Sequence, residues 1–134
     1  MKKSFIIIIL LIYLSSIMFI GFFGMQLTSY EQTFYVEQIQ VINENYNPST
    51  NRLIMQYQPY NLETDLFNPN VVQLEWRFYP ENASNRIVTF SSDHARAIVN
   101  SMGIVTFSAP GTANITIRST DGSEINKSII VWFQ

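Results

Sequence analysis

The chain has 134 residues, of which 47% are hydrophobic and 13% are charged, and its formal net charge at pH 7 is −2. This length leaves room for one domain, the low charged fraction argues against a disordered chain, and the slight negative charge argues against a nucleic-acid-binding protein. The chain has no cysteine and one histidine, which excludes disulfides, thiol chemistry and thiolate metal sites.

The amino-terminal segment gives the strongest signal in the sequence. Lys2 and Lys3 are followed by residues 4–30, which include no Asp, Glu, Lys, Arg or His. Within this segment, the apolar residues 5–23 would form a helix about 28 Å long, close to the ~30 Å thickness of the hydrocarbon part of a bilayer. The sequence therefore predicts a short cytoplasmic tail and one transmembrane anchor within residues 1–30, with the lipid bilayer as its partner.

A cleaved secretion signal is the main alternative, because signals also begin with basic residues and an apolar core. Here the apolar core is longer than the roughly 7–15 residues of a typical signal. Bulky Phe22, Phe23 and Met25 lie where small residues are required, and residues 21–24 and 27–29 offer only poor cleavage sites. We therefore expect a retained anchor, with a buried helix of a soluble domain as a third alternative.

The basic residues set the expected orientation of this anchor. Both lysines precede the apolar run, and the next Lys or Arg in the chain is Arg52. Since basic flanks stay on the cytoplasmic side, we expect a single-pass protein of the cell membrane with its amino terminus in the cytoplasm. The domain that follows the anchor is then extracytoplasmic.

Beyond Thr33 the hydrophobic pattern changes from helical to alternating. The clearest predicted strand is residues 71–79, where polar side chains alternate with Val72, Leu74, Trp76 and Phe78. Further strands are predicted at residues 33–42, 52–57, 86–90, 95–100, 103–108, 113–119 and 125–133. Helical stretches do not alternate with them, so we expect an all-β, two-sheet sandwich over residues 31–134.

Five segments follow one another in the last two thirds of the chain. They are YPENAS at 79–84, VTFSSD at 88–93, RAIV at 96–99, GIVTFSAPGTANITI at 103–117 and a closing strand at 129–133. As an ordered set over residues 71–133, they resemble the group 2 bacterial immunoglobulin-like (Ig-like) domains of bacterial surface proteins, including intimin-like and invasin-like adhesins. The resemblance implies an Ig-like sandwich that serves as a surface-exposed binding or spacer module without catalytic activity.

The chain also departs from this family in two places. Phe90 stands where the family usually has tryptophan, and residues 31–70 fit the family pattern poorly. Where the pattern holds, Gly103 and Gly111 are expected at tight corners of the backbone. The side chains expected to face inward together are Ala97 with Val99 and Ile115 with Ile117.

Length argues against a long-reach adhesin, because adhesins of this type usually carry several domains in tandem. One domain follows the anchor after a linker of residues 25–33, which reaches at most ~30 Å, and a sandwich adds about 35 Å. We therefore expect a membrane-anchored, non-enzymatic protein-interaction or scaffolding subunit at a bacterial cell surface, with a protein partner in or near the same membrane. The alternative is a secreted single-domain adhesin or carbohydrate-binding module, released after signal cleavage.

Two groups of residues resemble active or metal sites. Ser91, Ser92, Asp93 and His94 include the residue types of a hydrolytic triad, but triads converge from separate elements, so we expect a solvated turn and no enzyme. A hydrolase that uses His94 is kept as a third class of function. Calcium would favour oxygen ligands such as those of Glu63, Asp65, Asn68 and Asn70, but their spacing matches no known calcium loop. We expect them to solvate a connection, with no metal or cofactor.

Residues 45–70 are the predicted place for partner contact, because this segment departs from the family and is long for a connection. Tyrosines and apolar side chains are favoured at the centres of protein interfaces. The candidate contact residues are Tyr46, Tyr57, Tyr60, Leu62, Leu66 and Phe67.

Overall fold

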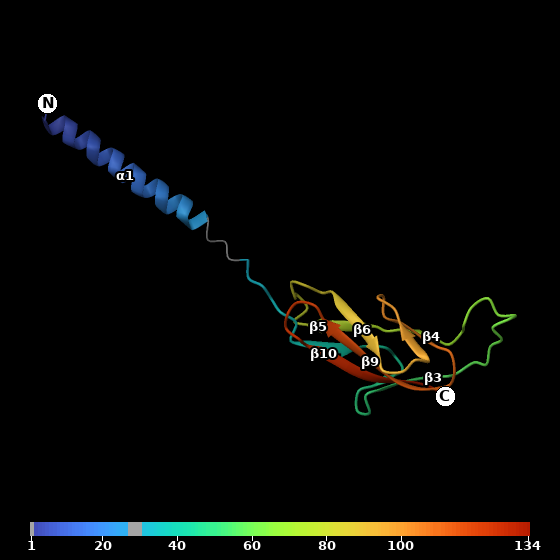
Figure 1. Cartoon of the computed structure of the whole chain (residues 1–134). Helices are drawn as coiled ribbons and strands as arrows, with labels where there is room; N and C mark the ends of the chain where they lie inside the picture. Colours follow the sequence, from blue (N-terminus) through green and yellow to red (C-terminus); the bar gives the residue numbers. More distant parts are fainter. Residues whose placement is uncertain (1, 27–30) are drawn as a thin grey trace. The chain divides into compact units, whose positions relative to one another are not determined.

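The computed structural model describes residues 2–26 and 31–134 of the chain (Figure 1). Contacts between residues divide the chain into two compact units, Met1–Gln32 and Thr33–Gln134. The first unit contains the one helix of the described residues, and the second, called the β domain below, contains all ten of their strands.

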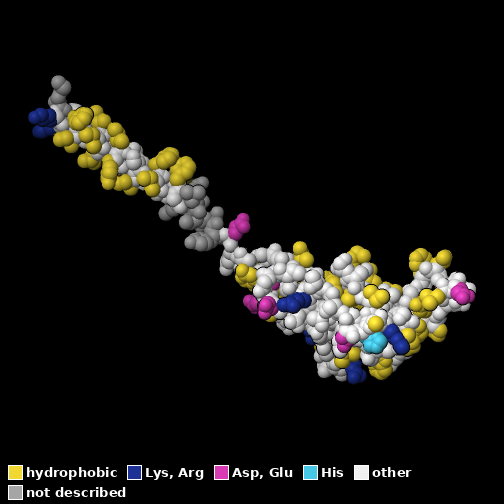
Figure 2. All heavy atoms as spheres, viewed as in Figure 1, with side chains coloured by type: hydrophobic (Ala, Val, Ile, Leu, Met, Phe, Trp, Pro, Cys, Tyr) yellow, Lys and Arg dark blue, Asp and Glu magenta, His cyan; other side chains and the backbone are white. Residues whose placement is uncertain are grey.

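Helix α1 (Lys2–Gln26) is apolar on every side. Over Lys2–Gly24 it has a mean hydropathy of 2.8, and it is the one described helix long and apolar enough to cross a membrane. None of its described side chains is buried, and hydrophobic groups follow one another along the face seen in Figure 2, between the lysines and the atoms drawn in grey. The hydroxyl groups of Ser15 and Ser16 donate to the carbonyl oxygen of Ile12, at 2.8 and 2.9 Å, so they carry no unpaired polar group into an apolar medium. An all-round apolar helix is typical of a membrane span.

The predicted cleavage positions at residues 27–29 lie outside the described residues, as does Tyr30. The predicted division between residues 30 and 31 stays a prediction.

One layer of the β domain is a five-stranded sheet in the order β2-β3-β10-β9-β6. The strands are β2 (Tyr46–Asn47), β3 (Arg52–Met55), β10 (Asn126–Phe133), β9 (Gly111–Ser119) and β6 (Val88–Ser92). β3 runs parallel to β10, and the other pairs are antiparallel. The long β9–β10 pair is the centre of this sheet.

The second layer is built around an interrupted strand. β4 (Val71–Gln73) pairs with β8 (Ile104–Phe107), which also pairs with β7 (Ala97–Val99). β5 (Trp76–Tyr79) pairs instead with β1 (Gln38–Val41). The expected all-β sandwich, preceded by one apolar helix, is confirmed.

The prediction of one continuous strand over residues 71–79 is wrong, although its alternation is right. Val72, Leu74 and Phe78 are buried and the polar residues between them are exposed. At Leu74 the N–H still donates to the carbonyl of Gly103, at 2.9 Å, whereas the carbonyl of Glu75 accepts from Ile42, also at 2.9 Å. The strand changes partners at this point and is therefore split into β4 and β5.

The early strands also differ from their predicted bounds. Predicted strand 33–42 begins only at Gln38, because the backbone N–H groups of Phe34 and Val36 donate to the side chains of Ser84 and Asp121 instead of to a neighbouring strand. Predicted strand 52–57 ends at Met55, although Tyr57 N–H still donates to Gln134. The two-residue strand β2 was not predicted, since so short a strand has no periodicity to detect.

The later strands lie where the alternation placed them, with shifted ends. Predicted strand 86–90 is β6, which begins and ends two residues later, and predicted strand 113–119 is β9, which begins earlier at Gly111. Strands β7, β8 and β10 are shorter than the predicted 95–100, 103–108 and 125–133. Near these ends some backbone N–H groups donate to side chains and not to a neighbouring strand, as those of Met102 and Ile104 do to the side-chain oxygen of Asn100.

The core lies between the two layers and is wholly apolar at its centre. Ala97, Ile115 and Ile117 are buried and Val99 is half-buried against the core, which confirms their inward orientation. The rings of Phe107 and Phe133 lie 4.6 Å apart at the end where the chain finishes. The buried apolar residues are Val36, Ile39, Val41, Leu53, Val72, Leu74, Phe78, Ala83, Ala97, Val105, Phe107, Ala113, Ile115, Ile117, Ile129, Val131 and Phe133.

Asp121 ties the first residues of the β domain to the turn between β9 and β10. Its carboxylate accepts hydrogen bonds from the N–H of Val36 at 2.6 Å, the hydroxyl of Ser119 at 2.7 Å and the N–H of Ser123 at 2.9 Å. Desolvation alone would raise the pKa of Asp121, but the hydrogen bonds together prevail and hold this pKa far below its usual range. The ionised carboxylate of Asp121 therefore fixes the segment that leads into β1 to the β9–β10 turn.

Candidate functional site

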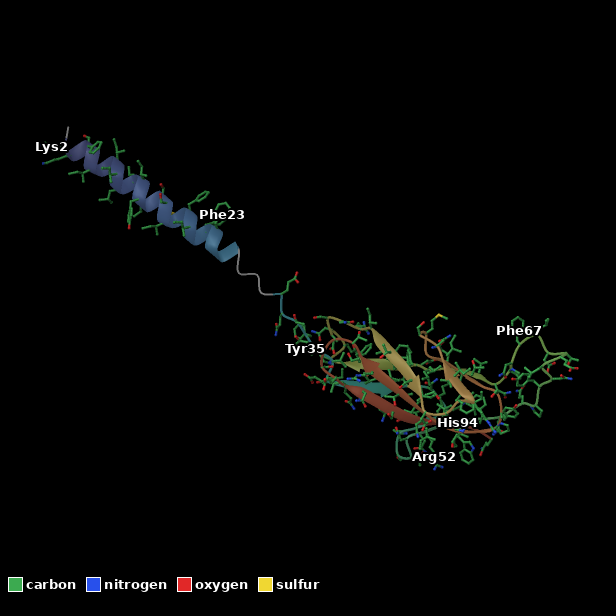
Figure 3. All side chains as sticks on the ribbon, in the orientation of Figure 1. Lys2, Phe23, Tyr35, Arg52, Phe67 and His94 are labelled. Atoms are coloured by element: carbon green, nitrogen blue, oxygen red, sulfur yellow. The ribbon has the colours of Figure 1, made fainter. Side chains whose placement is uncertain are left out.

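The connection between β3 and β4, residues 56–70, is the main irregular feature of the β domain. It projects from one end of the sandwich (Figure 1), and Phe67 on it lies at the opposite end of the domain from Tyr35 (Figure 3). Leu62, Leu66 and Phe67 are 83%, 91% and 86% exposed. These values exceed those of every other exposed large apolar side chain in the β domain.

The base of this connection is closed by Asn70, which is completely buried. Its side-chain oxygen accepts from the N–H of Gln58 at 2.7 Å, and its side-chain nitrogen donates to the carbonyl of Gln58 at 2.8 Å. The Asn70 amide thus pairs with Gln58 as a neighbouring strand would. Asn68 donates to the carbonyl of Phe107 at 2.6 Å, which fastens the same base to β8.

A tight turn over residues 61–65 shapes the tip. The N–H of Asn61 donates to the Asp65 carboxylate at 2.6 Å, and the N–H of Asp65 donates back to the carbonyl of Asn61 at 2.7 Å. The side chain of Asn61 also accepts from the N–H of Glu63 at 2.9 Å. We call residues 61–67, with their exposed apolar side chains, the apolar loop.

The structure separates the six predicted contact residues into two groups. Leu62, Leu66 and Phe67 lie on the apolar loop, and half-buried Tyr60 lies beside it. Tyr46 is half-buried against the core from β2, and its hydroxyl donates to Asn51 at 2.6 Å.

Tyr57 is also half-buried against the core, and its hydroxyl lies 3.4 Å from the carbonyl of Ser108. The two tyrosines Tyr46 and Tyr57 therefore have structural contacts of their own. Whether any of the six residues binds a partner stays a prediction.

Three of the four side chains considered for calcium have an oxygen that already accepts a backbone hydrogen bond. Asp65 accepts from the N–H of Asn61, Asn68 from that of Asn70, and Asn70 from that of Gln58, whereas the side chain of Glu63 is exposed. Among the described residues, no group of three or more His, Asp or Glu side chains is placed to hold a metal ion.

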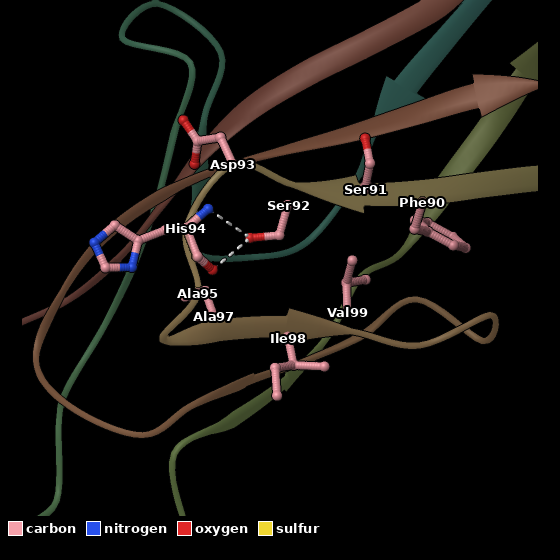
Figure 4. A pocket seen from close by; sticks show the side chains of 9 residues that line it. All are labelled: Phe90, Ser91, Ser92, Asp93, His94, Ala95, Ala97, Ile98 and Val99. Atoms are coloured by element: carbon pink, nitrogen blue, oxygen red, sulfur yellow. Dashed lines mark hydrogen bonds between the residues drawn. The ribbon is translucent and has the colours of Figure 1, made fainter.

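Ser92, Asp93 and His94 do not form a triad in this structure. The imidazole of His94 points away from the Ser92 hydroxyl, which instead contacts the backbone N–H and carbonyl of His94 at 3.3 and 3.2 Å (Figure 4). Nδ1 of His94 accepts from the N–H of Arg96 at 3.1 Å.

The carboxylate of Asp93 is occupied by β9 and not by His94. It accepts from the side chain and the N–H of Asn114, at 2.6 and 2.7 Å. The side-chain hydrogen bond from Asn114, followed by the backbone one, lowers the pKa of Asp93. The hydrogen bonds of Ser92, Asp93 and His94 therefore stabilise the exposed turn between β6 and β7, where the sequence predicted a solvated turn.

An aromatic pair lies between β5 and β6. The rings of Trp76 and Phe90 meet edge to face with their centroids 5.1 Å apart. Gly103 lies against both rings with φ at +79°, and a Cβ at this position would be 2.9 Å from Phe90 and 3.0 Å from Trp76. Phe90 therefore fills an aromatic position, and Gly103 is confirmed at a corner that requires glycine. Gly111, with φ at +150°, is the first residue of β9.

Two exposed apolar side chains outside the apolar loop were not proposed from the sequence. Ile98 on β7 is 69% exposed, and Met102 in the following turn is 62% exposed. The strand period could have shown Ile98, because its neighbours Ala97 and Val99 face inward and alternate residues face opposite sides. The row Val71, Thr106 and Ile98 crosses the outer face of β4, β8 and β7.

The comparisons with known proteins agree with the fold. Residues 68–129 match the family model of the bacterial Ig-like domain (group 2). A search of curated proteins found no match. The match begins just after Phe67, so the apolar loop precedes it, and it ends at Ile129, halfway along β10. The resemblance read from the sequence is thus confirmed: residues 68–129 are similar to the bacterial Ig-like domain of group 2.

Proposed function

We propose that this protein is a membrane-anchored, non-enzymatic interaction or scaffolding subunit at a bacterial cell surface. The observation that carries the proposal is α1, which is apolar on all sides and uncharged after Lys3, followed by an Ig-like sandwich. A helix of this composition gains free energy on leaving water for lipid, and no charged residue opposes it. An Ig-like domain and one such helix are consistent with a surface protein.

The absence of catalysis is part of the proposal. Domains of this family are typically non-catalytic, and function has to be argued from a site and not from a fold. The residue types of a triad are present in the β6–β7 turn, but Asp93 is paired with Asn114 and His94 with Arg96. This geometry supports a binding module and does not support a hydrolase.

The orientation in the proposal follows from charge. Lys2 and Lys3 precede the span, so the positive-inside rule favours a cytoplasmic amino terminus and an extracytoplasmic β domain. The partner is then a protein in or near the same membrane. The contact region includes the apolar loop, with Tyr46, Tyr57 and Tyr60 as further candidates.

The size of the solubilised protein tests the interaction. Membranes that contain the full chain are dissolved in a mild detergent, and the mass of the protein in the resulting particles is measured. We expect particles with several times the 15.5 kDa of one chain, because the chain remains bound to its partner. Particles with the mass of a single chain, at protein levels found in the cell, would contradict the proposal.

A further inference from the structure

We propose that the apolar loop inserts its tip into an apolar cleft of a partner protein, and that lysine or arginine side chains border this cleft. The inference rests on the proposed function, since it names the chemistry of the partner and the part of this chain that binds it. Three observations carry it: the exposure of the tip, its fixed shape and its charge.

The tip exposes three large apolar side chains. Leu62, Leu66 and Phe67 are each more than four-fifths exposed, within six consecutive residues. Single exposed apolar side chains are common on protein surfaces, but a group of three on one loop marks an interaction site. Figure 2 shows hydrophobic and acidic side chains together on this projection of the β domain.

The loop is held in shape before any partner binds. Asn70 pairs with Gln58 at the base, and Asn61 pairs with Asp65 within the turn, each through two hydrogen bonds. A loop that is already ordered loses little conformational entropy when it binds. These hydrogen bonds keep the backbone of the loop in a shape that exposes its apolar side chains, as a surface for protein contact requires.

The charge of the loop separates the possible occupants. Glu63 and Asp65 lie between the apolar side chains, and the chain has no Lys or Arg between Arg52 and Arg77. Anionic lipid headgroups would repel this acidic tip, since both carry negative charge, whereas segments that bind such membranes carry basic residues. A second copy that meets it symmetrically would bring like charges together. A protein cleft with a basic border is complementary to it in both polarity and charge.

Cross-linking in intact membranes tests the inference with the full chain. A photoreactive amino acid is placed at Thr64, whose side chain is exposed within the loop, and the adducts formed on illumination are identified by mass spectrometry. We expect one main protein adduct, with Lys or Arg close to the cross-linked apolar residues. Phe67→Ser is expected to lower its yield about tenfold, as loss of a central apolar anchor does.

Charge variants distinguish a cleft with a basic border from a purely apolar contact. Glu63→Lys is expected to lower the adduct yield about fivefold, and Glu63→Gln less, because the side chain of Glu63 faces the basic border of the cleft. Ile98→Ser, which removes an exposed apolar side chain from β7, outside the apolar loop, is expected to leave the yield unchanged. All variants are checked for an unchanged melting temperature, since each substituted side chain is exposed.

Other binding partners of the apolar loop would give different adducts in this experiment. A main adduct with phospholipid, or with a second copy of this chain, overturns the inference. So does a protein adduct whose yield ignores Glu63→Lys. If the solubilised chain is still part of a larger particle but Thr64 forms no protein adduct, the proposed function stands and the inference about the loop fails.

Discussion

Replacing Gly103 with alanine is expected to lower the free energy of unfolding of the β domain by about 3 kcal/mol. Two costs add. A residue with a Cβ is strained at φ +79°, and the new methyl group would lie 2.9 Å from Phe90 and 3.0 Å from Trp76. Both tryptophans of the chain, Trp76 and Trp132, lie in the β domain, so denaturant unfolding of the full chain in detergent can be followed by their fluorescence.

Gly122→Ala separates these two costs. Gly122 has a similar φ of +89°, but a Cβ there would meet no atom within 4 Å. This variant is expected to lose only about 1–2 kcal/mol, the backbone part. In a Phe90→Ala background, Gly103→Ala is expected to cost less than it does alone, since one of the two rings is gone. Equal losses for Gly103→Ala and Gly122→Ala would show that the aromatic pair does not press on Gly103.

Asn70→Ala is expected to destabilise the β domain by about 3 kcal/mol. The substitution removes the two hydrogen bonds to Gln58 and leaves a cavity where a fully buried amide was. Without this pairing, the base of the apolar loop opens, so hydrogen exchange of the Gln58 amide should accelerate. Urea unfolding and amide exchange on the full chain measure the two effects.

Asn126→Ala is the control for the loss of an asparagine. The side chain of Asn126 is exposed and makes one long contact, 3.4 Å to the carbonyl of Glu124. Its replacement should change the unfolding free energy by less than about 0.5 kcal/mol. If Asn70→Ala were as mild as Asn126→Ala, the loop would not depend on the Asn70 amide for its closure.

The fold could be predicted because alternation and turn residues are local signals. Residues 71–79 alternate strictly, and the sequence therefore showed which of their side chains are buried. It could not show that this strand changes partners at Leu74, because hydrogen bonds from Ile42 and to Gly103 come from distant parts of the chain. The same holds for Val36, whose N–H bonds to Asp121 and not to a strand.

The sequence predicted where the candidate site lies, but not which of its side chains are exposed. The length of the segment and its departure from the family pointed to residues 45–70. Which tyrosines turn toward the core depends on tertiary contacts, such as that of Tyr46 with Asn51. The role of Asn70 was also hidden, because a polar residue in a loop gives no sign that it is buried.

We expect the apolar segment to hold the chain in the membrane while the β domain lies outside it. Ser49 is exposed in the turn between β2 and β3, and the natural chain has no cysteine, so Ser49→Cys gives a single thiol. A membrane-impermeant maleimide is added to cells whose cytoplasmic membrane is intact. We expect the thiol to be labelled before lysis, on a chain that stays in the membrane fraction with its amino-terminal segment. Labelling only after lysis, or labelled chains in the medium that lack this segment, would contradict the account.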